Sequence, residues 1–206
     1  MKKDVYTSDI AFTPTVKALQ ASKGSRQAYA RMEQRGSWES SITEELQMLI
    51  AQQSSFYMAT ANADGQPYIQ HRGGPAGFLK VVDAQTLGFV DFSGNQQFIS
   101  VGNLSENPKV HLFLMDYTHR RRIKIWGEAR IVNNDPELIA KWMPENYRAK
   151  PERAILIQVK AWDVNCPQHI PVLFDAEKVK QALDAKDEQI RQLTAELERL
   201  KLGRMS

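Results

Sequence analysis

The middle of the sequence is dominated by short segments rich in β-branched and aromatic residues, and this pattern limits the possible folds more than any other feature. In the clearest segment, 122–132, Ile123 and Ile125 face one way and Lys124 faces the other. Alternation with a period of two is typical of a strand that buries one face. Strands are also predicted over 55–61, 67–72, 77–82, 87–92, 109–116 and 154–164. Seven short strands with few long helices predict a closed or sandwiched, mainly β architecture rather than a parallel, doubly wound sheet.

Helical patterns precede the strands. The first 40 residues form a predicted helical extension that is interrupted at 23–25. Ser41 and Glu44 then have the spacing of a capping box, and an apolar stripe follows them. We therefore expect a second helical segment to begin at Ser41.

Two shorter helices are predicted between the strands, and a longer one at the C-terminus. The short ones cover 95–106 and 134–142, and the second begins with Asp135-Pro136, an N-cap followed by proline. Near the C-terminus, apolar residues fall on alternating steps of three and four, with Lys186 as the polar break. They are Val179, Leu183, Ile190, Leu193, Leu197 and Leu200. This short heptad pattern fits either a self-associating coiled coil or a helix that packs on its own domain.

Composition excludes several classes of protein. The chain has 27 basic and 24 acidic residues, a net charge of +3, which is too small to indicate a nucleic-acid partner. Its apolar runs are far shorter than the ~20 residues that span a bilayer, so no membrane partner is expected. The single cysteine, Cys166, cannot form an internal disulfide, and the four histidines lack metal-ligand spacing. We expect a cytoplasmic protein without a bound metal.

Two segments could bind an anion. His71–Phe78 places three glycines beside Arg72, so the backbone can approach an anion while a guanidinium supplies charge. Asp91–Gln97 joins a predicted strand to a predicted helix, where amides at the helix N-terminus can hold a phosphate. Each segment could equally be an ordinary turn.

Two other segments carry reactive or charged side chains. The basic run His119–Lys124 enters a strand and is either a solvated edge or a source of one inward arginine. In Asn165–Ile170, Cys166 and His169 suggest a nucleophile and its base, although an inert, buried cysteine fits the same sequence.

Three runs in the order Gly88–Gln97, Gly102–Val110 and Arg122–Ala129 resemble the pyridoxamine 5'-phosphate oxidase-like flavin-binding family. The hairpin Asp64–Pro67 continues this resemblance, which covers about residues 45–165. The segments at 71–78 and 165–170 are similar to those of its flavin-nucleotide-binding branch.

The resemblance implies a split β-barrel that forms a homodimer with flavin mononucleotide (FMN) at the subunit interface. The residues that it implies as cofactor-binding are Arg72, Gly73, Phe78, Lys80, Asp91, Asn95, Gln96, Gln97, Arg122, Cys166, Gln168 and His169. Arg72, Lys80 and the turn at 95–97 would meet the flavin phosphate. Arg122 would lie near the flavin ring. We extend this implication ourselves to residues 165–169, whose position after the last strand suits a loop that closes over the ring.

On this basis the chain divides into a helical extension (1–40), a flavin-binding split barrel (41–174) and a C-terminal helix (175–206). The expected function is two-electron flavin chemistry on an unidentified small molecule or electron donor, with no catalytic side chain assigned. The oxidase's Ser-Arg-Lys triplet on the phosphate is Asn95-Gln96-Gln97 here, which removes two positive charges. The arginine- and histidine-bearing C-terminal segment that the oxidase uses for the pyridoxal substrate is replaced by the coil-like tail, so vitamin B6 is not the expected substrate. The alternatives are a non-catalytic protein that binds flavin, haem or deazaflavin, and an interaction protein that acts through its tail.

Overall fold

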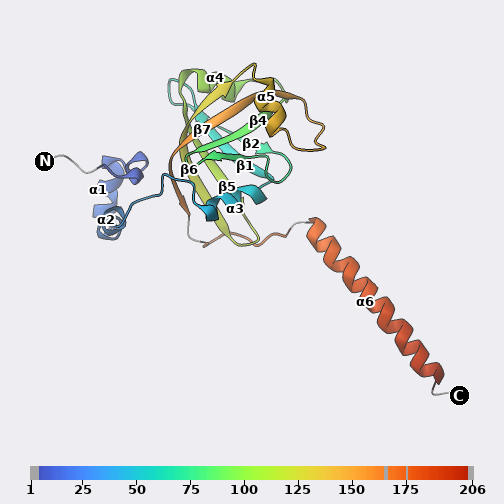
Figure 1. Ribbon diagram of the computed structural model, residues 1–206. Coiled ribbons are helices and arrows are strands. Elements are labelled where there is room, and N and C mark those ends of the chain that lie inside the picture. The colour runs from blue at the N-terminus through green and yellow to red at the C-terminus, as the bar shows by residue number, and fades with distance from the viewer. Residues whose placement is uncertain (1–4, 165–166, 175, 204–206) are drawn as a thin grey trace. The chain divides into compact units, whose positions relative to one another are not determined.

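The computed structural model describes residues 5–164, 167–174 and 176–203 of the 206-residue chain. Its centre is one seven-stranded sheet in which all paired neighbours are antiparallel, with the order β2-β1-β5-β6-β7-β4-β3 (Figure 1). The strands are β1 (Ser55–Ala61), β2 (Pro67–Gly73), β3 (Lys80–Asp83), β4 (Thr86–Phe92), β5 (Lys109–Asp116), β6 (Arg121–Val132) and β7 (Pro151–Val164). The prediction of seven short strands is therefore confirmed.

The two ends of the sheet meet, which makes the fold a split barrel. β2 is the first strand in the order and β4 is the last but one, yet Arg72 of β2 forms an ion pair with Asp91 of β4. This contact requires the sheet to curl, and the predicted split-barrel fold is confirmed.

The alternation predicted for β6 is also confirmed. Ile123, Ile125 and Ala129 point into the core and are at most 5% exposed. Gly127 lies on the same face, and a Cβ atom there would be only 2.7 Å from the carbonyl oxygen of Gln158 on β7. The close approach of β6 and β7 explains a glycine in the middle of a long strand.

The strand predicted over 77–82 begins later than expected, at Lys80. Gly77 has a φ of 78°, and the amide of Phe78 donates to the carbonyl of Pro75, so these residues form a turn. Phe78 is nevertheless buried, beneath Phe56 in a stack with 5.5 Å between ring centroids.

The predicted capping box at Ser41 is wrong. Helix α3 (Glu44–Gln52) begins at Glu44, and the side chain of Thr43 accepts the hydrogen bond from the amide of Leu46. Ser41 lies in a bend before the helix and is tied to the sheet, because its carbonyl accepts a hydrogen bond from Nε1 of Trp162.

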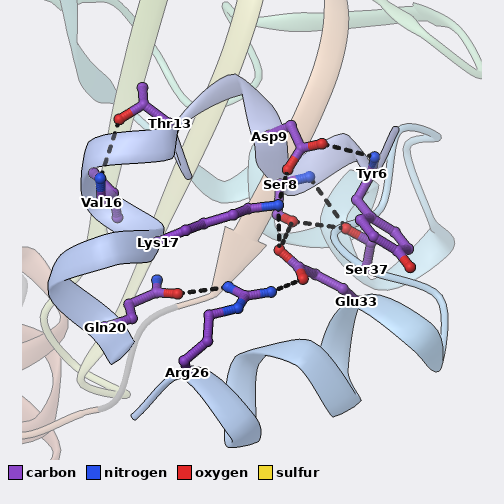
Figure 2. Close-up of polar contacts among 10 residues, drawn as sticks. All are labelled: Tyr6, Ser8, Asp9, Thr13, Val16, Lys17, Gln20, Arg26, Glu33 and Ser37. Atoms are coloured by element: carbon purple, nitrogen blue, oxygen red, sulfur yellow. Dashed lines mark hydrogen bonds and ion pairs between the residues drawn. The ribbon is translucent and has the colours of Figure 1, made fainter. Parts of the chain in front are cut away.

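The N-terminal extension consists of a 3₁₀ helix, η1 (Thr7–Ile10), and the helices α1 (Pro14–Ser22) and α2 (Arg26–Gln34), with the predicted break between the last two. A buried polar cluster holds them together (Figure 2). Glu33 is 4% exposed and forms ion pairs with Arg26 and with Lys17, the latter at 3.1 Å. Trp38 then stacks on Trp126 of β6, with 4.6 Å between ring centroids.

Of the two helices predicted between strands, α5 (Pro136–Trp142) starts at the predicted N-cap, where Asp135 accepts from the amide of Leu138 at 2.9 Å. Helix α4 (Ile99–Glu106) starts four residues later than predicted. Gln96 and Phe98 have positive φ values of 59° and 54°, so 95–98 forms an irregular turn instead of a first helical turn.

Residues 117–120 and 168–206 form a second compact unit, which we describe by itself. Within it, the hydroxyl of Thr118 donates to the carbonyl of Leu173 at 3.0 Å, and α6 (Ala176–Gly203) provides the helix predicted for the tail. In the described part of the chain, none of the helices has the length and apolar character needed to cross a membrane.

Candidate functional site

Two adjoining hollows lie where the ends of the sheet meet. The first is lined by Tyr68, Gln70, Arg72, Asp91, Phe92, Gly94, Asn95, Gln96, Gln97, Phe98, Ile99, Ser100, Val101 and Glu152. The second is lined by Gln70, His71, Arg72, Gly73, Phe78, Phe89, Val90, Asp91 and Phe92. The structure thus brings together seven residues that the sequence analysis singled out: Arg72, Gly73, Phe78, Asp91, Asn95, Gln96 and Gln97.

Arg72 and Asp91 form the wall that both hollows share. Nη1 of Arg72 donates to Oδ1 of Asp91 at 2.5 Å, and the two side chains are 11% and 7% exposed. Burial raises the pKa of the Asp91 carboxyl, while the guanidinium groups of Arg72 and Arg153 oppose that rise. The Arg72 guanidinium also lies over the ring of Phe89, 5.8 Å from its centroid.

Arg153 is a member of this cluster that the sequence analysis missed. It is the cross-strand partner of Asp91 on β7, and its Nε atom lies 3.8 Å from Oδ2 of that carboxylate. Its Nη2 atom donates to Glu152 at 2.6 Å. Because β7 starts at Pro151, three residues before the predicted start of this strand at Ala154, the two residues fall within the sheet.

Two hydrogen-bond donors in the cluster are unused. The Nε atoms of Arg72 and Arg153 are buried and have no hydrogen-bond partner among the described residues. A buried donor without an acceptor is unfavourable. Of these two arginines, Arg72 lines both hollows and Arg153 is absent from the lining of each. Two arginines face two carboxylates, Asp91 and Glu152, so the attraction for an anion depends on directed donors rather than on net charge.

The turn before α4 forms the opposite wall of the first hollow. Oδ1 of Asn95 accepts from the amide of Gln97 at 3.2 Å, which stabilises the turn. The N-cap residue of α4, Phe98, makes no side-chain capping hydrogen bond. The first residues of α4 line the hollow, and their amides carry the partial positive charge of a helix N-terminus.

The other predicted site residues described in the barrel are Lys80 and Arg122. Lys80 lines neither hollow and pairs with Gly88 in the sheet. Arg122 lines a separate pocket beside Trp38 and Trp126, where its own Nε atom is buried without a partner in the described structure. Gln168 and His169 belong to the second unit, and Cys166 lies outside the described residues.

The arrangement fits the phosphate end of a cofactor such as FMN better than a metal. The unused guanidinium nitrogens, the uncapped helix N-terminus and the polar turn all offer donors to phosphate oxygens. Among the residues that the structure describes, no group of three or more His, Cys, Asp or Glu side chains is placed to hold a metal ion.

Most of the barrel domain matches the model of a known protein family. A family model described as pyridoxamine 5'-phosphate oxidase matches residues 42–166, which is more than half of the chain. A search of the curated proteins gives no significant match.

The chain is similar to several solved structures. HupZ of Group A Streptococcus is 23% identical, with a TM-score of 0.50 over 65% of this chain and 99% of its own. An FMN-binding protein of Syntrophomonas wolfei is 13% identical, with a TM-score of 0.47 over 71% of this chain and 97% of its own. HutZ, the haem storage protein of Vibrio cholerae, is 15% identical, with a TM-score of 0.45 over 60% and 94%. Likeness to HupZ at this level identifies the fold alone, and the two lower scores support no argument.

Proposed function

We propose, because the chain belongs to the pyridoxamine 5'-phosphate oxidase-like family, that it binds FMN and acts as a flavin-dependent oxidoreductase on a small molecule. The family supports a flavin-binding barrel, and the cofactor and the reaction of this chain are our inference. We further propose that the protein works as a homodimer and, given its single cysteine, in a reducing cytoplasm.

The observation that carries the proposal is the unused guanidinium donor of Arg72 beside the uncapped N-terminus of α4. Arg72 would donate to the flavin phosphate through Nε while its Nη1 stays on Asp91. Asp91 thus acts as a positioning residue, since it holds the guanidinium at the junction of the two hollows. The amides at the start of α4 and the side chains of the 95–97 turn would complete the phosphate site.

When bound, the flavin supplies the two-electron chemistry at its ring, so the side chains need only bind and orient it. Phe78 and Phe89 give the second hollow an apolar wall that suits the flavin or its substrate. Arg122 lines a different pocket from Arg72. We propose, independently of the phosphate site, that Arg122 contacts the flavin ring. If that contact exists, Arg122→Ala changes the flavin reduction potential, and an unchanged potential removes the role.

One class of substrate is disfavoured. We do not propose a vitamin B6 phosphate as the substrate, because helix α6 stands where the oxidase has the arginine- and histidine-bearing segment that it uses for the pyridoxal substrate. We propose a small organic substrate or electron donor that meets the flavin ring.

Haem binding is the second candidate, and His71 is the observation that favours it. His71 is among the residues that line the second hollow, and its exposed ring packs edge-on against Tyr57, with 5.5 Å between ring centroids. An imidazole can bind haem iron, and a guanidinium can pair with a propionate. Such a protein would carry or sense its cofactor without turnover.

The absorbance spectrum of the purified protein separates these candidates, with the released cofactor identified by mass. Flavin bands with released FMN, bleached anaerobically by a reductant, support the oxidoreductase. A Soret band lost in His71→Ala supports the haem candidate. A protein that neither contains nor takes up FMN contradicts the proposal.

A further inference from the structure

Helix α6 carries an apolar stripe that is exposed along its described side chains. The helix spans 28 residues, Ala176–Gly203, and every side chain described on it, from 176 to 201, is exposed. Six aliphatic residues are between 43% and 64% exposed: Val179, Leu183, Ile190, Leu193, Leu197 and Leu200. Most of the stability of a helix in a protein comes from the packing of its apolar face, so an exposed stripe of this kind is a strong driving force for association.

The stripe follows a heptad register along the whole helix. Leu183, Ile190 and Leu197 occupy a positions, seven residues apart. Val179, Leu193 and Leu200 occupy d positions, and Lys186 occupies the one remaining d position between them. This narrow a/d stripe is the seam of a coiled coil, whereas a helix packed on a globular domain usually has a wider apolar face.

We propose that the stripe on α6 is covered by α6 of a second copy of this chain, in a two-stranded, parallel and in-register coiled coil. This inference does not depend on the proposed flavin function, because α6 lies outside residues 42–166 that match the family.

Lys186 favours two strands and a parallel orientation. In a parallel, in-register pair, both copies of Lys186 meet in one layer, and each can extend to Asp187 at the neighbouring e position of the second copy. In an antiparallel pair of the same length, each lysine would face Ile190 in a separate layer. A third or fourth strand would remove the path by which the lysine reaches water.

A second charge pair agrees with this register. Glu196 is at a g position, and Lys201 is at the e position that it meets on a parallel partner. The other g positions with a described side chain are Ala182 and Gln189, so the g–e pairs bring no like charges together, and the like charges that meet in the seam are the two copies of Lys186.

Cysteine cross-linking of the full-length chain tests the proposal, with Cys166→Ser as the background. In Ile190→Cys the two a-position sulfurs face each other within disulfide distance only in the parallel, in-register pair. Glu188→Cys is the matched control, because position 188 is an f position on the outer side of the coil. We expect the cysteine at 190 to form an interchain disulfide about tenfold faster than the cysteine at 188, since only the former is held in a suitable geometry.

A second set of variants shows that the stripe causes the cross-link. Adding Leu193→Lys and Leu197→Lys to the cysteine-190 chain places charges in the seam and should abolish the disulfide. Adding Ala195→Lys, which changes an f position, should leave it intact. Equal cross-linking at 188 and 190, or none at 190, overturns the proposal. The absence of a cross-link would mean that the stripe packs on its own chain or pairs in another orientation.

Discussion

Nη1 of Arg72 lies 2.5 Å from Oδ1 of Asp91, and this ion pair connects β2 to β4 across the opening of the curled sheet. The same pair forms the wall between the two hollows of the candidate site. One interaction therefore closes the barrel and positions the donor that we assign to the flavin phosphate.

The contributions of Arg72 and Asp91 to the free energy of unfolding should be strongly coupled. Because both side chains are largely buried, removing one partner leaves the other charge without compensation. We expect Arg72→Ala or Asp91→Ala to lower the free energy of unfolding by about 3 kcal/mol each. The double variant should be about 1–3 kcal/mol more stable than the sum of the single effects predicts. Urea unfolding of the four proteins measures this, and additive effects would contradict it.

His111 should make stability depend on pH. It is partly buried, with its ring 4.9 Å from that of Trp126, and burial together with the nearby charge of Lys124 lowers its pKa below 6.5. The unfolded chain then binds a proton more readily than the folded one. Stability is therefore fully present above pH 6.5 and is lost as the pH falls from there towards the lower folded pKa.

An NMR titration of the imidazole measures this pKa directly, and Lys124→Gln should raise it. In His111→Gln the slope of stability against pH in this range should be smaller. An unchanged slope would show that other groups cause it.

The buried carboxylate of Glu33 should hold the N-terminal extension together. Glu33→Ala leaves Lys17 and Arg26 without the group that they share, and we expect a loss of about 1–3 kcal/mol because hydrogen bonds to charged groups are lost. Cleavage by a protease between residues 5 and 38 should become faster. Glu145→Ala removes an exposed acid and should change neither quantity. Equal cleavage rates in the two variants would contradict the role of Glu33.

Two glycines in the barrel domain should respond in opposite ways to alanine. At Gly127 the new Cβ would lie 2.7 Å from the carbonyl oxygen of Gln158, so β6 and β7 must move apart. We expect Gly127→Ala to be destabilising by about 1–3 kcal/mol. At Gly102, inside α4, a Cβ meets nothing within 4 Å, and Gly102→Ala should stabilise by about 0.5–1 kcal/mol. Urea midpoints test both, and a tolerated Gly127→Ala would contradict the strand spacing.

The strands could be predicted from the sequence because residues two positions apart in a strand lie on the same face. A strand with one buried face therefore shows an alternating apolar pattern. Residues 55–61 and 109–116 have the predicted bounds. The start of α4 could not be predicted, since Asn95–Phe98 has an ordinary helix-compatible composition and only the positive φ of Gln96 and Phe98 excludes helix there. The N-cap of α3 was misplaced because Ser41 is drawn into contact with Trp162, 121 residues away.

Only the part of the candidate site that lies in local sequence motifs could be predicted. Arg72 and the 91–97 segment stood out as local motifs, and the structure brings them together. Arg153 carries no local signal, since only the pairing of β4 with β7 places it opposite Asp91. Lys80 and Arg122 were expected at the cofactor from the resemblance, and neither lines the hollows.

The central claim is that Arg72 holds the phosphate of FMN, and comparison of FMN with riboflavin tests it most directly. We expect the wild type to bind FMN more tightly than riboflavin, which lacks the phosphate. Loss of a charged hydrogen bond of about 1.5–3 kcal/mol in Arg72→Ala should lower FMN affinity about 10–100-fold. Riboflavin affinity should change little, so a destabilised fold cannot mimic the result. Arg130→Ala, an exposed arginine on β6, is the control with the same change in charge. Equal affinities for FMN and riboflavin in the wild type, or an unchanged preference in Arg72→Ala, would contradict the claim.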